Sequence, residues 1–200
     1  MLAVLFCNST DSVKCCLPFK VYTKKLANTC AKVAVLYSQV ESNAIVLAFN
    51  TLRSLIMWAQ DAALFEATLK RMYNEFYRAS KLGGGSYGIQ DKLRTSQNCF
   101  IELLSVDRQV GYQMGFQYIR QLCLHFRSVR NNMTKDVLKN IYSWQFYNCL
   151  KLWVLALTNA KISDLALLVH PLVQLIVGVL RLSNNIKHFP FHVKLFNLLV

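Results

Sequence analysis

Apolar residues recur every three or four positions along most of the chain, which is the spacing of one face of an α-helix. The alternation of apolar and polar residues that is typical of strands is almost absent. Asp61, Asp107 and Thr134 stand where N-cap residues are expected, and Pro171 and Pro190 can each open a helix. Helices are therefore predicted over residues 24–39, 42–59, 61–80, 89–105, 107–130, 134–158 and 171–182, and from 190 onward.

The spacing of these helices predicts the fold class. Residues 1–22 have no clean period and are expected to form an irregular leader, or the natural start of the protein lies upstream. Residues 23–200 are expected to form one all-α domain with a glycine-rich loop near 82–88, and the last helix is expected to be truncated. Antiparallel-looking helix pairs begin near positions 24, 61, 107 and 164, a spacing that resembles a HEAT- or armadillo-like α-solenoid, although no sequence repeat is visible.

The predicted helix 107–130 has one apolar and one polar face. On a helical wheel, the apolar face carries Tyr118, Ile119, Leu122, Phe126 and Val129, which are expected to form core. The polar face carries Gln113, Gln117, Arg120 and Arg127, but Phe116 and Leu124 stray onto it. These two residues either pack under a neighbouring helix pair or await a partner.

The predicted helix 134–158 differs, because its apolar side chains point in all directions. A helix that is apolar all round is buried on more than one side. Trp144 and Trp153 are therefore both predicted to be buried core residues, unless a partner covers part of this helix.

Composition and charge narrow the class of protein. Apolar residues make up 54% of the chain and charged residues 16%, which excludes intrinsic disorder. The net charge is +13, and residues 111–200 contribute +8 of it from 10 basic and 2 acidic side chains. A basic half suits an acidic partner, either RNA or protein, although it also fits a merely solvated basic face.

Three arginines are the candidates for such contacts. Arg120 and Arg127 are seven positions apart and share a helix face, and Arg130 follows them. They suit phosphates or an acidic helix, and the alternative is a solvated helix flank. Phe116 and Leu124 join them as candidate partner-binding residues.

No constellation of residues indicates catalysis, a metal or a cofactor. His188 and His192 are four apart, but Pro190 separates them and no third ligand is near. The glycine-rich loop lacks the Gly-Lys-Ser/Thr that a phosphate-binding loop requires. The seven cysteines contain no Cys-x-x-Cys, and Cys123 and Cys149 are interpreted as buried apolar residues in a reducing compartment. We expect no enzyme and no membrane-spanning helix.

Four segments together resemble the nucleolar complex protein 2 family. They are GFQYIRQLCLHFR at 115–127, IYSWQFYNCLKLW at 141–153, VHPLVQLIVGVLRL at 169–182 and HFPFH at 188–192. The resemblance is good from about residue 60 onward, and the order and spacing of the segments make a chance match improbable.

The sequence departs from the family pattern at three positions. Ser143 stands in place of Asn, His170 in place of Tyr, and His192 in place of Arg, which puts a phosphate-binding role of position 192 in doubt. Family members are also much longer, so this chain would be a fragment or a truncated relative.

The resemblance implies a non-catalytic helical scaffold of the nucleolus and nucleoplasm in assembly and export of the large ribosomal subunit, acting through protein–protein contacts. The implied partners are other nucleolar complex proteins, bound as heterodimers, and pre-60S particles. Direct binding of ribosomal RNA, or binding of histones or a transcription regulator, remain the alternatives. The resemblance implies no cofactor.

Overall fold

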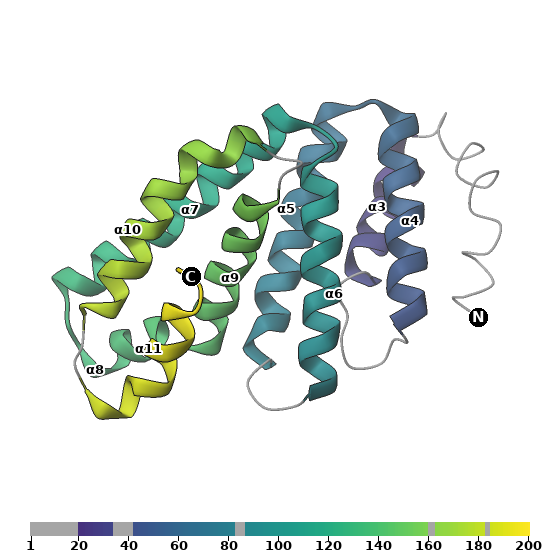
Figure 1. The fold of residues 1–200 in the computed structure, drawn as a ribbon. Coiled ribbons are helices and arrows are strands. Elements are labelled where there is room, and N and C mark those ends of the chain that lie inside the picture. Colours follow the sequence, from purple (N-terminus) through teal and green to yellow (C-terminus); the bar gives the residue numbers. More distant parts are fainter. Residues whose placement is uncertain (1–19, 34–41, 83–86, 160–162, 183–184) are drawn as a thin grey trace. The chain divides into compact units, whose positions relative to one another are not determined.

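The computed structural model describes residues 20–33, 42–82, 87–159, 163–182 and 185–200, and every regular element among them is a helix (Figure 1). The all-helical prediction is therefore confirmed. Residues 1–19 of the expected leader and most of the glycine-rich loop lie outside the described residues, whereas residues 20–22 of that leader are helical and begin α3, which corrects its predicted end. The chain divides into two compact units, unit 1 up to Leu103 and unit 2 from Leu104.

The described part of unit 1 contains four long helices and one short turn of 3-10 helix. They are α3 (Lys20–Val33), α4 (Ser42–Ala59), α5 (Ala62–Ala79), η1 (Ser80–Leu82) and α6 (Tyr87–Leu104). Asp61 caps α5 as predicted, since its Oδ1 accepts hydrogen bonds from the backbone N–H groups of Ala63 and Leu64.

The core of unit 1 is built from large apolar side chains. α3 packs against α4 and α5, and the Tyr73 ring of α5 lies 6.0 Å from the Phe100 ring of α6. Leu52, Phe76 and Phe100 have no solvent exposure. Since complete burial of such side chains is worth about 1.5–3 kcal/mol each, these contacts hold the four helices together.

Unit 2 places its longest helix against two others. Its elements are α7 (Arg108–Asn131), α8 (Lys135–Ile141), α9 (Trp144–Thr158), η2 (Ser163–Leu168), α10 (Val169–Leu180), η3 (Ile186–His188) and α11 (Phe189–Phe196). The Asp107 carboxylate caps α7 as predicted, by accepting from the N–H groups of Gln109 and Val110. Thr134 occupies the N-cap of α8 without a side-chain hydrogen bond.

Contacts along α7 fix the direction of its neighbours. Tyr118 stacks on Trp153 and His125 lies against Phe146, so α9 runs antiparallel to α7. Leu168 lies beside Gly115 at one level of α7, while Gly178 lies beside Phe126 at another, so α10 runs parallel to it (Figure 1). A Cβ at Gly115 would lie 3.1 Å from side-chain atoms of Leu165 and Leu168, which explains why the smallest residue stands at this close approach.

The helix predicted over 134–158 is two helices, which also corrects one core prediction. The first helix, α8, ends at Ile141. Ser143 is the N-cap of α9, and its Oγ accepts a hydrogen bond from the backbone N–H of Phe146. Trp153 follows Trp144 by nine positions, which at about 100° per residue is about two and a half turns, so the two side chains lie on opposite sides of the helix. Trp153 is fully buried as predicted, but Trp144 is 39% exposed, so the prediction that it is buried was wrong.

None of the described helices is long and apolar enough to cross a membrane.

Candidate partner-binding surface

The outer face of α7 carries an exposed row of mixed apolar and basic side chains. We call Phe116, Arg120, Leu124 and Arg127 the α7 stripe, because they follow one another at helical intervals along one face. Phe116 is 48% exposed and Leu124 is 53% exposed, so neither packs under another described helix. Both arginines are exposed as well.

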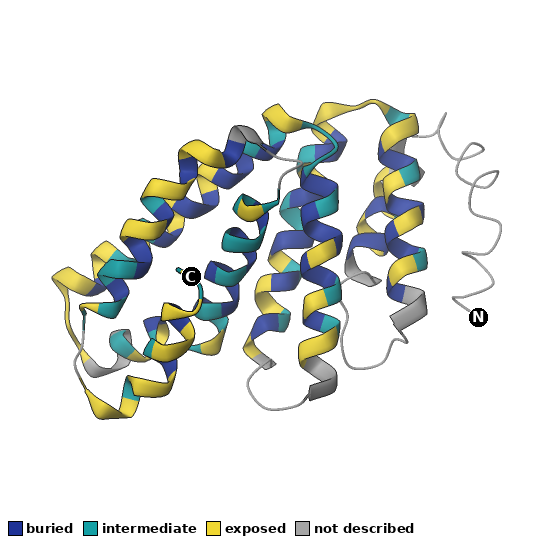
Figure 2. Ribbon diagram, in the orientation of Figure 1, coloured by how far each residue is buried: buried dark blue, intermediate teal, exposed yellow. Residues whose placement is uncertain are grey.

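The opposite face of α7 accounts for the position of the stripe. Tyr118, Ile119 and Leu122 are buried as predicted, and Phe126 is half-buried against α10. Figure 2 shows this division as dark and yellow segments that recur along the ribbon of the helix. Burial of the inner face fixes the rotation of α7, and the stripe is thereby held outward on a rigid element.

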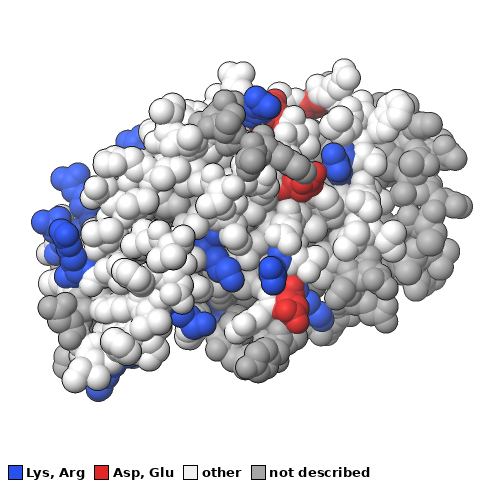
Figure 3. Space-filling model, viewed as in Figure 1, with Lys and Arg blue, Asp and Glu red and all other residues white. Residues whose placement is uncertain are grey.

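The arginines of this region have no carboxylate partner in the described structure. Arg120, Arg127, Arg130 and Arg181 make no ion pair with another described residue. From Leu104 to Val200 the sequence has 11 basic and 3 acidic residues, a net charge of +8. Figure 3 shows blue side chains gathered over the end of unit 2 at which α7 and α10 terminate, with no red side chain drawn beside them.

Arg130 lies apart from the stripe, although sequence analysis grouped it with Arg120 and Arg127. It lines an open pocket between the last turns of α7 and α10, and Arg181 lines the same pocket. The sequence could not pair these two arginines, because 51 positions separate them and only the parallel packing of α10 on α7 brings them to one site.

A second exposed apolar row, on α11, was missed by sequence analysis. Phe189, Val193 and Phe196 lie on one face at the spacing i, i+4, i+7, and Ile186 precedes them. The inward residues Phe191 and Leu195 are buried. The spacing was visible in the sequence, but the shortness of the helix concealed which face would be covered.

Three titratable rings of unit 2 pack against one another. Tyr142 stacks on the His188 ring at 4.0 Å and donates a hydrogen bond to the Val179 carbonyl at 3.3 Å, while His192 lies 5.6 Å away. Burial, and then the neighbouring His188, lower the pKa of His192. Among the described residues, no three His, Cys, Asp or Glu side chains group as metal ligands would.

The four cysteines that the structure describes carry no sign of activation. Cys149 is fully buried as predicted, whereas Cys123 is only half-buried. Burial raises the pKa of Cys30 and of Cys123, and raises that of Cys99 to about 11. A reactive cysteine requires a lowered pKa, so these thiols are suited to packing rather than to nucleophilic attack.

Comparison with known proteins identifies the family. The sequence pattern of the Noc2p family matches residues 63–200. The chain belongs to the Noc2p family. The matched region includes all four segments on which the resemblance rested, and it contains the α7 stripe and the pocket.

Relatives from animals, plants and fungi agree with this assignment. The chain is 32% identical over 179 residues to Nucleolar complex protein 2 of Drosophila melanogaster, covering 88% of this chain and 23% of that protein. It is 39% identical over 98 residues to Nucleolar complex-associated protein 2 of Arabidopsis thaliana, covering 48% of this chain and 13% of that protein. The chain is 31% identical over 189 residues to an uncharacterised NOC2 family protein of Schizosaccharomyces pombe, covering 88% of this chain and 26% of that protein. The chain thus spans about a quarter or less of each relative's length.

Proposed function

We propose that this chain is a non-catalytic helical scaffold in nucleolar assembly of the large ribosomal subunit, acting in the nucleolus and nucleoplasm. In this proposal it binds other nucleolar complex proteins as a heterodimer and contributes to pre-60S particles. The names of the relatives, which refer to nucleolar complexes, support the setting. The HEAT-like repeat class is part of the same proposal, supported by the succession of helix pairs.

The observation that carries the proposal is the composition of the α7 stripe. Arginine is enriched at protein interfaces, and exposed Phe and Leu gain stability when a partner removes them from water. Phe116 and Leu124 alternate with Arg120 and Arg127 on a single rigid face. An acidic amphipathic helix would match both features, since its apolar side chains and carboxylates recur at the same intervals.

Direct binding of RNA is the second candidate, favoured by the net charge of +8 in unit 2. Single-stranded RNA is held by basic grooves with aromatic platforms on which bases stack. The α7 stripe offers one exposed aromatic ring, Phe116, and an aliphatic side chain, Leu124, where a second platform would be expected. Protein contacts therefore take precedence in the proposal, and histones are tested as a third class of partner.

Charge reversal on the stripe tests the proposal. Arg120→Glu with Arg127→Glu should leave the fold intact, because both side chains are exposed, and should lower co-purification of nucleolar complex proteins at least tenfold. Arg94→Glu with Arg108→Glu is the matched control, since it changes the net charge equally at exposed arginines elsewhere. Tagged chains are expressed in cells, and bound proteins are quantified by mass spectrometry with and without ribonuclease.

The outcomes separate the three classes of partner. Loss of partner proteins that is specific to the stripe variant and insensitive to ribonuclease supports a protein scaffold. Loss of every partner on ribonuclease treatment, together with steep salt dependence of oligouridine binding, would establish the RNA module instead. Stripe-dependent binding of purified histones would point to the third class. Equal binding by the stripe variant and the control would remove the α7 stripe from consideration.

A further inference from the structure

The pocket between the last turns of α7 and α10 has the composition of a peptide-binding site. Its volume is about 650 Å³. Ligand pockets usually measure about 300–1,000 Å³, so it can accept a large side chain. Phe126, Met133, Val177 and Leu182 supply apolar walls, and Arg130, Gln174 and Arg181 supply the polar groups.

Gly178 shapes the pocket through its contact with Phe126. A Cβ at position 178 would lie 2.9 Å from Cζ and 3.0 Å from Cε1 of the Phe126 ring, closer than carbon atoms approach without displacement. The missing side chain therefore lets the ring lie against α10 and leaves the space beyond it to the pocket. A larger residue at 178 would displace the ring.

The two arginines place positive charge on this pocket. Arg130 lies in the last turn of α7 and Arg181 is the C-cap residue of α10, and both are exposed. The partial negative charge of the helix ends favours arginine at both positions. A guanidinium nevertheless has five N–H donors, and neither arginine makes an ion pair with another described residue. Donors remain for carboxylates from outside.

We propose that this pocket binds a large apolar side chain of an acidic protein segment, with carboxylates on either side of it paired to Arg130 and Arg181. The inference rests on the proposed scaffold function and adds a second binding site with a defined ligand chemistry. Arg–carboxylate pairs are commonly bidentate, which fixes the orientation of the segment while the apolar side chain supplies buried area.

The pocket favours a peptide over RNA. Single-stranded RNA is held on successive aromatic rings on which bases stack, whereas Phe126 is the one aromatic residue in the pocket lining. The remaining walls are aliphatic or thioether side chains, and the flexible Met133 can adapt to different apolar side chains. An aliphatic pocket between two arginines suits an apolar residue among acids.

Methionine methyl signals offer a direct test, because the chain has a matched pair of exposed methionines. Met133 lines the pocket and Met57 lies in unit 1, and each is 56% exposed. The full 200-residue chain is labelled with ¹³C-methyl methionine and titrated with a capped acidic peptide that has a central Leu-Phe pair among Glu and Asp. The Met133 signal should shift and the Met57 signal should stay.

Variants then test the two parts of the recognition. Arg130→Glu with Arg181→Glu should weaken binding of the acidic peptide at least tenfold, and should bind the corresponding Lys-flanked Leu-Phe peptide instead. The control pair Arg94→Glu and Arg108→Glu should bind the acidic peptide within about twofold of the unchanged chain, since Arg108 lies roughly 33 Å from Arg130 along α7. Circular dichroism verifies that each variant is folded.

Four results would overturn the inference. The first is a Met133 signal that does not change on titration, and the second is binding of a peptide with Ser in place of Leu-Phe as tight as that of the Leu-Phe peptide. The third is a loss of binding in the control pair as large as in the Arg130 and Arg181 variant. The fourth is displacement of the peptide by oligouridine that itself shifts the Met133 signal. The last result would assign the pocket to RNA. A failure here is distinguishable from failure of the proposed function, because the co-purification experiment changes Arg120 and Arg127 and leaves the pocket intact.

Discussion

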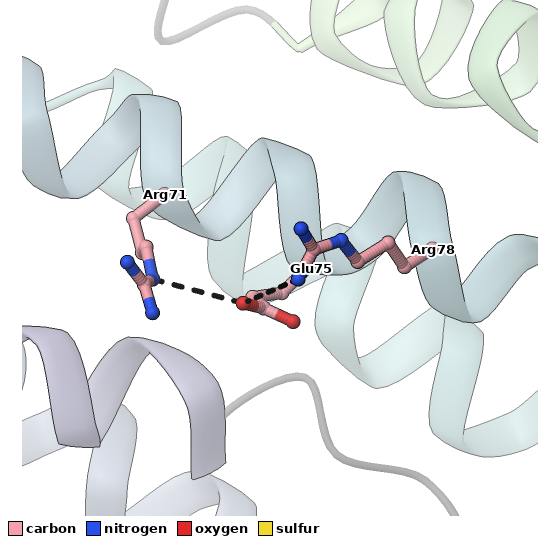
Figure 4. A network of polar contacts seen from close by, with 3 residues as sticks. All are labelled: Arg71, Glu75 and Arg78. Carbon is pink, nitrogen blue, oxygen red and sulfur yellow. Dashed lines mark ion pairs between the residues drawn. The ribbon is translucent and has the colours of Figure 1, made fainter.

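Units 1 and 2 are both helical with closed cores, but they treat their charged side chains differently. Unit 1 has 12 basic and 7 acidic residues, and several of its arginines are paired. Arg53 lies 3.8 Å from Glu102, while Arg71 and Arg78 share Glu75 at 3.6 Å each (Figure 4). Unit 2 has 11 basic and 3 acidic residues, and Arg120, Arg127, Arg130 and Arg181 have no carboxylate partner among the described residues.

This contrast separates two roles of surface charge. Paired charges on a helix stabilise it by only about 0.3–0.5 kcal/mol, and they leave little net field for a partner. Arginines without a carboxylate partner gain no ion-pair stabilisation, and in the proposed function their charge attracts and orients an acidic partner. We therefore expect the two units to respond alike to changes in their cores and differently to changes on their surfaces.

The largest expected effect tests the similarity of the cores. Phe76→Ala in unit 1 and Trp153→Ala in unit 2 each remove a fully buried ring. Each should lower the free energy of unfolding by about 3–5 kcal/mol, because the vacated space cannot collapse completely. Denaturant unfolding followed by circular dichroism measures both. A loss below about 1 kcal/mol for either variant would show that its core is not closed.

A smaller effect is expected at Trp144, on the exposed side of α9. Trp144 lies 6.4 Å from the Phe191 ring, and the Lys194 ammonium lies 5.4 Å from its ring centroid. Trp144→Ala should lower the free energy of unfolding by about 1 kcal/mol, the usual size of such exposed cation–π and ring contacts. The same unfolding experiment applies. A loss equal to that of Trp153→Ala would mean that Trp144 belongs to the core.

A third variant leaves two arginines of unit 1 without their carboxylate partner, as the arginines of unit 2 are among the described residues. Glu75→Gln removes the carboxylate that Arg71 and Arg78 share, and keeps the size of the side chain. The expected loss in unfolding free energy is below about 1 kcal/mol, since the arginines are partly exposed, and it should shrink further in high salt. Thermal unfolding at low and high salt provides the measurement. A loss of several kcal/mol would identify a structural ion-pair network.

The smallest expected effect concerns pH and α11. The pKa of His192 is lowered from its ordinary value of 6.5, first by burial and then by His188. The unfolded state therefore binds the proton on His192 more tightly than the folded state does. The contribution of neutral His192 to folding stability is complete above pH 6.5 and is lost as pH falls from there toward the lowered pKa. Backbone amide hydrogen exchange of residues 189–196 should become faster as the pH is lowered from 7.5 to 5.5, once the measured rates are corrected for the pH dependence of intrinsic exchange.

His192→Gln provides the control for this pH dependence. The variant removes the titrating group while keeping a polar side chain, so the corrected exchange of α11 should no longer change with pH. An unchanged pH dependence in this variant would assign the effect to another group, of which His188 is the nearest.

The family and the helices could both be predicted from the sequence, because both are recognised from residues that are close together along the chain. Helical periodicity depends on side chains three and four positions apart, and Asp61 and Asp107 cap helices through bonds to backbone groups two and three residues onward. The inner face of α7 was predicted for the same reason. Trp144 was misplaced because an apolar sequence around it could not reveal the break at Tyr142 and Ser143.

The two proposed binding surfaces differ in how far the sequence could predict them. The α7 stripe lies on one helix, so the sequence placed Phe116, Arg120, Leu124 and Arg127 on one face, and only tertiary burial of the other face showed that they remain exposed. The pocket was decided by tertiary structure alone. Arg130 and Arg181 meet because α10 packs parallel to α7, with Gly178 against Phe126 at their contact. Such a contact depends on how well distant surfaces fit together, which local periodicity does not encode.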